Sequence, residues 1–168
     1  AESLSKHQGD LWLWGLEELS GAAAESLSKC KGDLFLRGLT ELSDAAAALD
    51  WVQSLHPDSK SCWIAGYSFG AWIGMQLLMR RPEIEGFLSI APQPNTYDFS
   101  FLAPCPSSGL IIHGSEDKVA PPKDVQGLVD KLHTQKGILI TQKTLEGANH
   151  FFTDQTETLM AECEDYLD

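Results

Sequence analysis

Apolar segments of strand length alternate with helix-like segments along most of the chain, and this alternation constrains the fold more than any other feature. The clearest strand is CWIAGY (Cys62 to Tyr67), which is apolar nearly throughout and therefore fits a parallel strand buried on both faces. Further strands are expected in GFLSIA, GLIIH and ILITQKTL (86–91, 109–113 and 138–145). Helices are expected over about 44–55, 70–80, 121–132 and 159–167. Strands that alternate with helices indicate a parallel α/β sheet.

The first 43 residues contain an internal repeat. The segment ESLSKHQGDLWLWGLEELS (residues 2–20) matches ESLSKCKGDLFLRGLTELS (residues 25–43), so the repeat has a period of 23 residues. This period lies in the range of leucine-rich repeats, and the element G-D-L-x-L-x-G-L resembles a bacterial leucine-rich-like repeat in which a short strand precedes a helix. We therefore expect two repeat-derived βα units in residues 1–43, with strands at 11–16 and 34–39.

Together these segments predict a single domain over residues 1–168, with three α/β/α layers and a mostly parallel six-stranded sheet. Two strand orders satisfy right-handed crossovers, 2-1-3-4-5-6 and the alternative 1-2-3-4-5-6. In the alternative order Trp12, Trp14 and Phe35 lie on an uncovered face of the sheet. Burial of one such side chain stabilises the fold by about 1.5–3 kcal/mol, so this order forgoes that stabilisation. The order 2-1-3-4-5-6 is therefore favoured, and it places the first strand beside CWIAGY.

The charge and the cysteine content exclude several functions. Acidic residues outnumber basic ones 24 to 12, and the resulting net charge of −12 repels nucleic-acid phosphates and anionic lipid. The four cysteines are far apart and form no C-x-x-C pair, so we expect free thiols in a reducing compartment and no metal site. No apolar run approaches the roughly 18 residues of a membrane span, and the N-terminus lacks the pattern of a signal peptide. These features predict a soluble, cytoplasmic protein that binds neither nucleic acid nor membranes.

Three polar residues suited to nucleophile, base and acid roles each follow a predicted strand. Ser68 is the centre of GYSFG (66–70), a G-x-S-x-G motif where CWIAGY turns into a helix, and both glycines are expected to be sterically required in such a turn. Asp117 follows GLIIH, and His150 follows ILITQKTL. Glu116 competes with Asp117 for the acid role. His113, which ends a buried strand, is expected to be packed or hydrogen-bonded rather than to serve as a second base.

The chain order Ser, Asp, His after parallel strands is the order used by α/β-hydrolases. Residues 41–168 resemble the carboxyl-terminal part of a dienelactone-hydrolase-like α/β-hydrolase through ELSDAAAALDWV, GYSFGAW, IAPQPN, HGSEDKVAP and GANHFF. The resemblance implies that Ser68 is the nucleophile, His150 its general base and Asp117 the carboxylate that orients the imidazole. It also implies that the backbone N–H of Phe69 is an oxyanion donor, and that a small ester is hydrolysed through an acyl-enzyme without a cofactor.

The segment before Ser68 departs from this family. An α/β-hydrolase takes its second oxyanion N–H from a loop after an early strand, and no HGGG-type loop precedes Ser68. Loss of one oxyanion donor lowers kcat by about 10²–10³-fold, so weak activity is expected, with the turn Gly15-Leu16-Glu17 as the one place for a substitute N–H. The repeat and hydrolase patterns read alike near LSDAAA, which predicts a chimera of natural or engineered origin.

Two interpretations of the function remain open at this point. One is a weak serine esterase that acts on a small ester, and the other is a non-catalytic chimera that serves as a scaffold or binding module. Tyr67, Tyr97, Phe99 and Phe101 are candidates for the acyl pocket. For the last three, the alternative role is to fasten the long loop after Pro92 to the core. The sequence leaves the oligomeric state open.

Overall fold

The computed structural model describes residues 11–13, 34–36 and 42–167. The chain divides into two compact units, Ala1–Lys60 and Ser61–Asp168. The sequence predicts one domain whose two parts meet near residue 41. The structure places the boundary between the units after Lys60, and the single domain stays a prediction.

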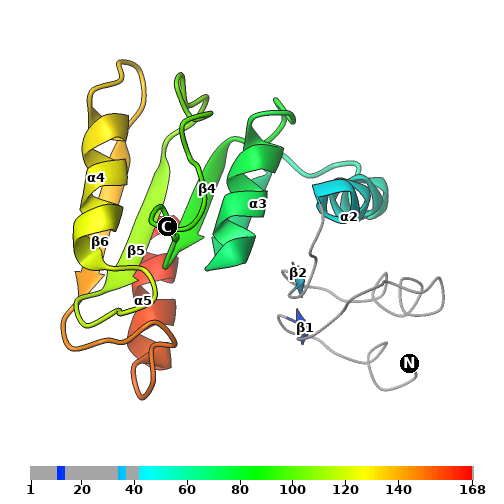
Figure 1. Ribbon diagram of the computed structural model, residues 1–168. Coiled ribbons are helices and arrows are strands. Elements are labelled where there is room, and N and C mark those ends of the chain that lie inside the picture. The colour runs from blue at the N-terminus through cyan, green and yellow to red at the C-terminus, as the bar shows by residue number, and fades with distance from the viewer. Residues whose placement is uncertain (1–10, 14–33, 37–41, 168) are drawn as a thin grey trace. The chain divides into compact units, whose positions relative to one another are not determined.

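In the first unit a short pair of strands precedes a helix (Figure 1). Strands β1 (Leu11–Leu13) and β2 (Leu34–Leu36) pair in parallel, and helix α2 spans Leu42–Leu55. β1 and β2 are neighbours in both predicted strand orders. The choice between those orders depends on the burial of Trp12, Trp14 and Phe35, whose side chains lie outside the described part of the chain. The six-strand order therefore stays a prediction.

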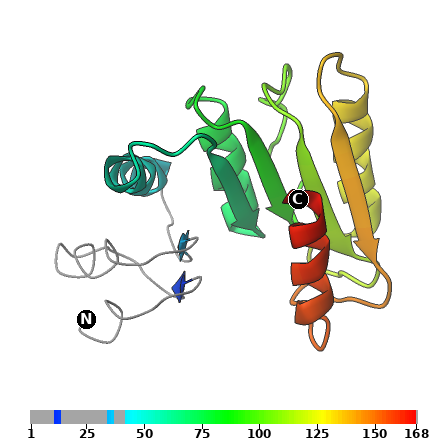
Figure 2. The ribbon, with the colours of Figure 1, turned by 180° about the vertical axis from the view of Figure 1, so that it is seen from behind.

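The second unit is built on a sheet of four parallel strands in the order β3-β4-β5-β6 (Figures 1 and 2). Leu110, Ile111 and Ile112 of β5 are fully buried, as required of a strand that is covered on both faces. The predicted parallel sheet and the order of its last four strands are confirmed. The strands are β3 (Trp63–Tyr67), β4 (Gly86–Ile90), β5 (Gly109–Gly114) and β6 (Ile140–Leu145).

Helices cover both faces of this sheet. α3 (Phe69–Leu78) and α4 (Pro122–His133) lie on one face and α5 (Thr156–Leu167) lies on the other, as a comparison of Figures 1 and 2 shows. α4 begins at the predicted pair of prolines, because proline fits the first turn of a helix. The second unit therefore contains the three α/β/α layers. The buried residues of α4 recur at helical spacing: Val125, Leu128, Val129 and Leu132.

The cysteines that the structure describes, Cys62, Cys105 and Cys163, are free thiols. Burial raises the pKa of the Cys163 thiol to about 11, so this thiol is protonated near neutral pH. Within residues 42–167 and the two short strands, no group of histidine, cysteine and carboxylate side chains is arranged to hold a metal ion. None of the described helices is long and apolar enough to cross a membrane.

The end of β5 lies against the loop that follows β6. A Cβ atom on Gly114 would overlap the carbonyl oxygen of Ala148, so only glycine fits at this position. The same Ala148 carbonyl accepts a hydrogen bond from the Glu116 N–H at 3.0 Å. Close backbone packing therefore holds the loops after β5 and β6 side by side, and these are the loops that carry two of the predicted site residues.

We predict opposite effects for alanine at two glycines. Gly114→Ala lowers the free energy of unfolding by about 1–3 kcal/mol or more, because the new methyl group overlaps backbone that cannot easily move. Gly127→Ala, on the exposed side of α4 with no atom within 4 Å of the new Cβ, raises it by about 0.5–1 kcal/mol through helix propensity. Urea unfolding of the two variants measures both changes. Equal stability of Gly114→Ala and the parent protein would contradict the packing described here.

His113 is buried inside the second unit, with 2% of its surface exposed. Its Nε2 lies 3.1 Å from Thr144 Oγ1 and 3.1 Å from Gln142 Nε2, and its Nδ1 lies 3.3 Å from the Gly114 carbonyl. These neighbours suit a neutral ring that donates from Nδ1 and accepts at Nε2. Burial lowers the pKa of His113 below its ordinary value. The residue is thus packed and hydrogen-bonded, as expected of a histidine at the end of a buried strand.

The depressed pKa of His113 predicts a stability that depends on pH. The unfolded chain takes up this proton near pH 6.5 and the folded chain only at a lower pH, so the contribution is present above about pH 6.5 and is lost as the pH falls below it. We expect His113→Asn, which does not titrate there, to lose less stability than the parent protein between about pH 7 and pH 5. Urea unfolding at both pH values gives the two losses. Identical losses would show that His113 does not titrate differently in the two states.

Candidate active site

Ser68 occupies a strained turn between β3 and α3. Its φ of 58° and ψ of −118° are values that residues other than glycine rarely adopt, so the surrounding structure must hold this conformation. Part of the support comes from the Ser68 N–H, which donates to the Ile90 carbonyl at the end of β4 (2.8 Å). The Ser68 side chain makes no capping bond to α3. This is the geometry of the strand-to-helix turn that presents a nucleophile.

The two glycines of the G-x-S-x-G motif differ in the space around them. A Cβ on Gly66 would overlap the Gly70 carbonyl and lie 2.7 Å from the Cα of Ala71, so glycine is required there. A Cβ on Gly70 would meet no atom within 4 Å. The expectation that both glycines are sterically required is correct for Gly66 and wrong for Gly70. The reason is that the Gly70 backbone crowds Gly66, whereas the space beside Gly70 itself is open.

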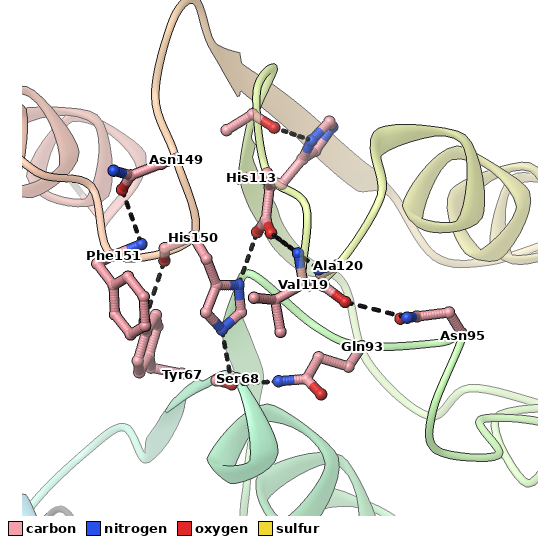
Figure 3. Close-up of polar contacts among 12 residues, drawn as sticks. Tyr67, Ser68, Gln93, Asn95, His113, Val119, Ala120, Asn149, His150 and Phe151 are labelled. Atoms are coloured by element: carbon pink, nitrogen blue, oxygen red, sulfur yellow. Dashed lines mark hydrogen bonds and ion pairs between the residues drawn. The ribbon is translucent and has the colours of Figure 1, made fainter.

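A continuous set of hydrogen bonds joins Ser68, His150 and Asp117. Figure 3 shows the contact between Ser68 and His150. The Ser68 Oγ lies 2.9 Å from His150 Nε2, and His150 Nδ1 lies 2.7 Å from Asp117 Oδ2. Both His150 and Asp117 are buried, with 4% and 3% of their surfaces exposed. Because the carboxylate accepts the Nδ1–H, Nε2 is left as an acceptor that faces the serine hydroxyl. The structure brings the three residues together, each from the loop after a parallel strand.

The Asp117 carboxylate is also fixed by its own loop. Its Oδ1 accepts hydrogen bonds from the backbone N–H groups of Val119 and Ala120, at 2.8 Å each. These bonds compensate for the burial of the carboxylate and leave Oδ2 for His150. The competing carboxylate, Glu116, is exposed. Asp117 is therefore the acid that meets the imidazole.

Gln93 is a fourth polar residue at this site, and it was not expected from the sequence. It follows β4 in the segment IAPQPN, and its Nε2 lies 2.5 Å from the Ser68 Oγ (Figure 3). Gln93 is nearly buried, with 9% of its surface exposed. Its position in the sequence could have indicated it. β4 pairs with β3, so a polar residue just after β4 lies at the same edge of the sheet as Ser68.

Two of the predicted pocket residues, Tyr67 and Tyr97, flank the site. The Tyr67 hydroxyl donates to the His150 carbonyl at 3.0 Å, and the two rings lie 5.4 Å apart. The Tyr97 ring lies 5.3 Å from the ring of Phe69 and 5.3 Å from that of Trp72. Tyr67 therefore supports the histidine loop, and Tyr97 joins an aromatic cluster beside the residue that follows Ser68.

The other two, Phe99 and Phe101, take a different position. Their rings stack with centroids 6.2 Å apart, and Phe99 is buried. Phe99 lines a cavity of about 650 Å³ between the loop after β4 and helix α4, and it does not line the cavity beside His150. The burial of Phe99 fits the alternative role of fastening the loop to the core, and the acyl-pocket role of Phe99 and Phe101 stays a prediction.

A smaller cavity of about 270 Å³ opens beside His150. Two of its lining residues are apolar yet exposed, Val119 at 43% and Phe151 at 72%. A small molecule bound next to the imidazole would cover these side chains and remove apolar surface from water. The cavity is lined by Glu116, Lys118, Val119, Asn149, His150 and Phe151.

Phe69 provides the first backbone amide of α3, directly after Ser68. The first N–H groups of a helix have no acceptor within the helix, and the helix dipole favours negative charge at that end. The Phe69 N–H is therefore suited to the oxyanion role that the resemblance implies. The turn Gly15-Leu16-Glu17, named as the place for a second N–H, lies outside the described residues.

Comparisons with known proteins place the chain in a family. A model of the dienelactone hydrolase family matches residues 24–166. A solved structure of a candidate α/β hydrolase of unknown function from Agrobacterium tumefaciens is 78% identical, with a TM-score of 0.75 over 85% of this chain and 65% of that one. An uncharacterized protein of Rickettsia prowazekii (strain Madrid E) is 51% identical over 125 residues, which are 72% of this chain and 52% of that protein. An α/β serine hydrolase homologue from Coxiella burnetii is 22% identical, with a TM-score of 0.67 over 98% of this chain and 86% of that one.

The comparisons also bear on the repeat near the N-terminus. The family model begins at residue 24 and so includes the second copy of the repeat, and the likeness to the Coxiella structure extends over nearly the whole chain. The comparisons give no support to leucine-rich repeats or to a chimera. A strand with alternate leucines followed by a helix is also an ordinary βα unit of an α/β protein, so the pattern is compatible with this family. The chain spans about half the length of the Rickettsia relative and 65% of the Agrobacterium one. The chain belongs to the dienelactone hydrolase family and has the α/β-hydrolase fold.

Proposed function

We propose that this chain is a serine hydrolase that cleaves a small ester through an acyl-enzyme. One observation carries the proposal: the hydrogen bonds from Asp117 through His150 reach the Oγ of a serine held in a strained turn. A serine hydroxyl is a weak nucleophile unless an adjacent base takes its proton. The family match supports the same class of reaction.

In the proposed reaction His150 first acts as the base. Ser68 Oγ attacks the carbonyl carbon of the ester, its proton passes to His150 Nε2, and the carbonyl π pair moves onto the oxygen. Asp117 stabilises the imidazolium through the 2.7 Å bond at Nδ1. His150 then protonates the departing alcohol, and the acyl group stays on Ser68. A water molecule, deprotonated by His150, repeats the sequence and releases the acid.

The surroundings of the triad favour a small substrate that is neutral or weakly charged. The exposed side chains of Val119 and Phe151 offer an apolar contact beside the imidazole. The net charge of −12 disfavours nucleic acid and anionic membranes as partners. The mechanism uses only side chains, backbone amides and water, and it therefore requires no cofactor. The non-catalytic alternative, a scaffold or binding module, has no observation that favours it over hydrolysis.

We predict that hydrolysis of p-nitrophenyl acetate depends wholly on Ser68 and His150. Because the members of a triad act as a unit, Ser68→Ala and His150→Ala should each lower kcat by about 10⁴–10⁶-fold. Labelling by a fluorophosphonate, which bonds to an activated serine with loss of fluoride, should disappear in Ser68→Ala. Absorbance of the released p-nitrophenolate measures hydrolysis, and the mass of the intact protein measures labelling.

Ser100→Ala is the matched control, since Ser100 is an exposed serine that donates to the Asp98 carboxylate. It should be labelled and should turn over substrate like the parent protein. Hydrolysis at the same rate by the parent protein, Ser68→Ala and His150→Ala would overturn the proposed function.

A further inference from the structure

The Ser68 hydroxyl has two hydrogen-bond partners, and the mechanism above uses only one of them. The Oγ lies 2.9 Å from His150 Nε2 and 2.5 Å from Gln93 Nε2 (Figure 3). A hydroxyl has one proton to donate and lone pairs to accept with. Each contact at Ser68 therefore has a definite direction.

The triad fixes the orientation of the Gln93 amide. Asp117 accepts the Nδ1–H of His150, so Nε2 of that ring is an acceptor and must receive the serine proton. The Ser68 Oγ can then only accept from its second neighbour, which must present an N–H. The opposite orientation, with Oε1 toward Ser68, would leave two acceptors competing for one proton. Gln93 therefore donates its amide N–H to the nucleophile.

Hydrogen bonds within the loop fix the main chain of Gln93, from which its side chain reaches Ser68. The Gln93 carbonyl accepts the N–H groups of Thr96 and Tyr97, at 3.0 and 2.9 Å. Further along the same loop, Asn95 Nδ2 donates to the Val119 carbonyl at 3.0 Å, which ties the loop to the segment beside Asp117. Gln93 is nearly buried, and a donor in such surroundings acts more strongly on a developing charge than it would in water.

We propose that the side-chain amide of Gln93 is the second oxyanion donor of this site, beside the backbone N–H of Phe69. The inference rests on the proposed function, because it concerns the same attack of Ser68 on an ester. As the bond from Oγ to carbon forms, the carbonyl π pair moves to an oxygen only two bonds away from Oγ. A donor already within hydrogen-bond distance of Oγ reaches that oxygen by a small rotation of its side chain. The amide transfers no proton, and it stabilises the negative charge by a hydrogen bond.

The side chain of Gln93 lies among the described residues of the site, and it donates directly to the nucleophile. α/β-hydrolases with an HGGG-type loop use a backbone N–H as the second oxyanion donor. Here the donor comes from the loop after β4, the strand that pairs with the nucleophile strand β3. A side-chain donor of this kind changes kcat by about 10²–10³-fold when it is removed.

The test replaces Gln93 by Met and by Glu, which keep the length of the side chain and remove the N–H donor. For each variant, kcat and KM are measured with p-nitrophenyl acetate, and Ki is measured with a trifluoromethyl ketone, which adds Ser68 to its carbonyl and leaves an oxyanion. We expect kcat to fall by about 10²–10³-fold while KM changes by less than about threefold. Ki should rise by the same factor as kcat/KM falls, because the inhibitor carries the same charge as the transition state.

Gln126→Met is the matched control, since Gln126 is an exposed glutamine of α4 that donates to the Asp130 carboxylate and makes no contact with Ser68. Its kcat should stay within about threefold of the parent value. Thermal unfolding of each variant shows whether it is folded. If Gln93→Met does not fold, the test uses Gln93→Glu alone.

The outcomes separate this inference from the proposed function. Ser68-dependent hydrolysis that survives unchanged in folded Gln93→Met and Gln93→Glu would overturn the role of Gln93 and leave the serine hydrolase standing. A fall in kcat/KM with no rise in Ki would also overturn it, because Gln93 would then only position the Ser68 side chain. A parent protein without any Ser68-dependent hydrolysis would contradict the proposed function itself, and the role of Gln93 with it.

Discussion

Parallel pairing of β3 to β6 in one register is the constraint on which the rest of the second unit depends. It brings the carboxyl ends of the four strands to one edge, and backbone bonds continue the pairing past the strand ends. The Ser68 N–H donates to Ile90, the Ala91 N–H to Ile112 and the Ser115 N–H to Leu145, at 2.8 to 2.9 Å. Each loop is thereby tied to the next strand along. The site residues lie close together because these bonds hold their loops side by side at the carboxyl ends of the strands.

The same edge stores backbone strain and buried charge. Among the described residues, those other than glycine with a left-handed φ all lie in loops after β3, β4 and β6: Ser68, Ala91, Phe152 and Asp154. Such conformations cost about 1–3 kcal/mol each and persist only where the surroundings hold them. The Asp117 carboxylate is buried as well, and it is stable there because it accepts bonds from two amides and from His150. The stability of the apolar sheet offsets these costs, and the result is a fixed array of polar groups.

Much of this arrangement could be predicted from the sequence. A buried parallel strand is an apolar run, and the edge rule then places Ser68, Asp117 and His150 together from their positions after three such runs. Gln93 also follows such a run, so the same rule brings it to this edge, but its contact with Ser68 depends on the path of a proline-rich loop that the sequence does not reveal. The interpretation of the repeat as leucine-rich and chimeric has no support from the comparisons, for a related reason. Alternate leucines before a helix describe any βα unit, and the spacing of the two copies does not say which sheet they join.

The reactivity of Ser68 after a change at Asp117 tests the central claim most directly. Asp117→Asn keeps the size of the side chain, but it removes the carboxylate that holds the His150 tautomer and stabilises the imidazolium. The rate constant for fluorophosphonate labelling of Ser68 should fall by about 10³–10⁴-fold in this variant. In Glu116→Gln, the neighbouring exposed carboxylate, it should change by less than about threefold. Equal labelling rates in Asp117→Asn and the parent protein, or a larger loss in Glu116→Gln, would contradict the account.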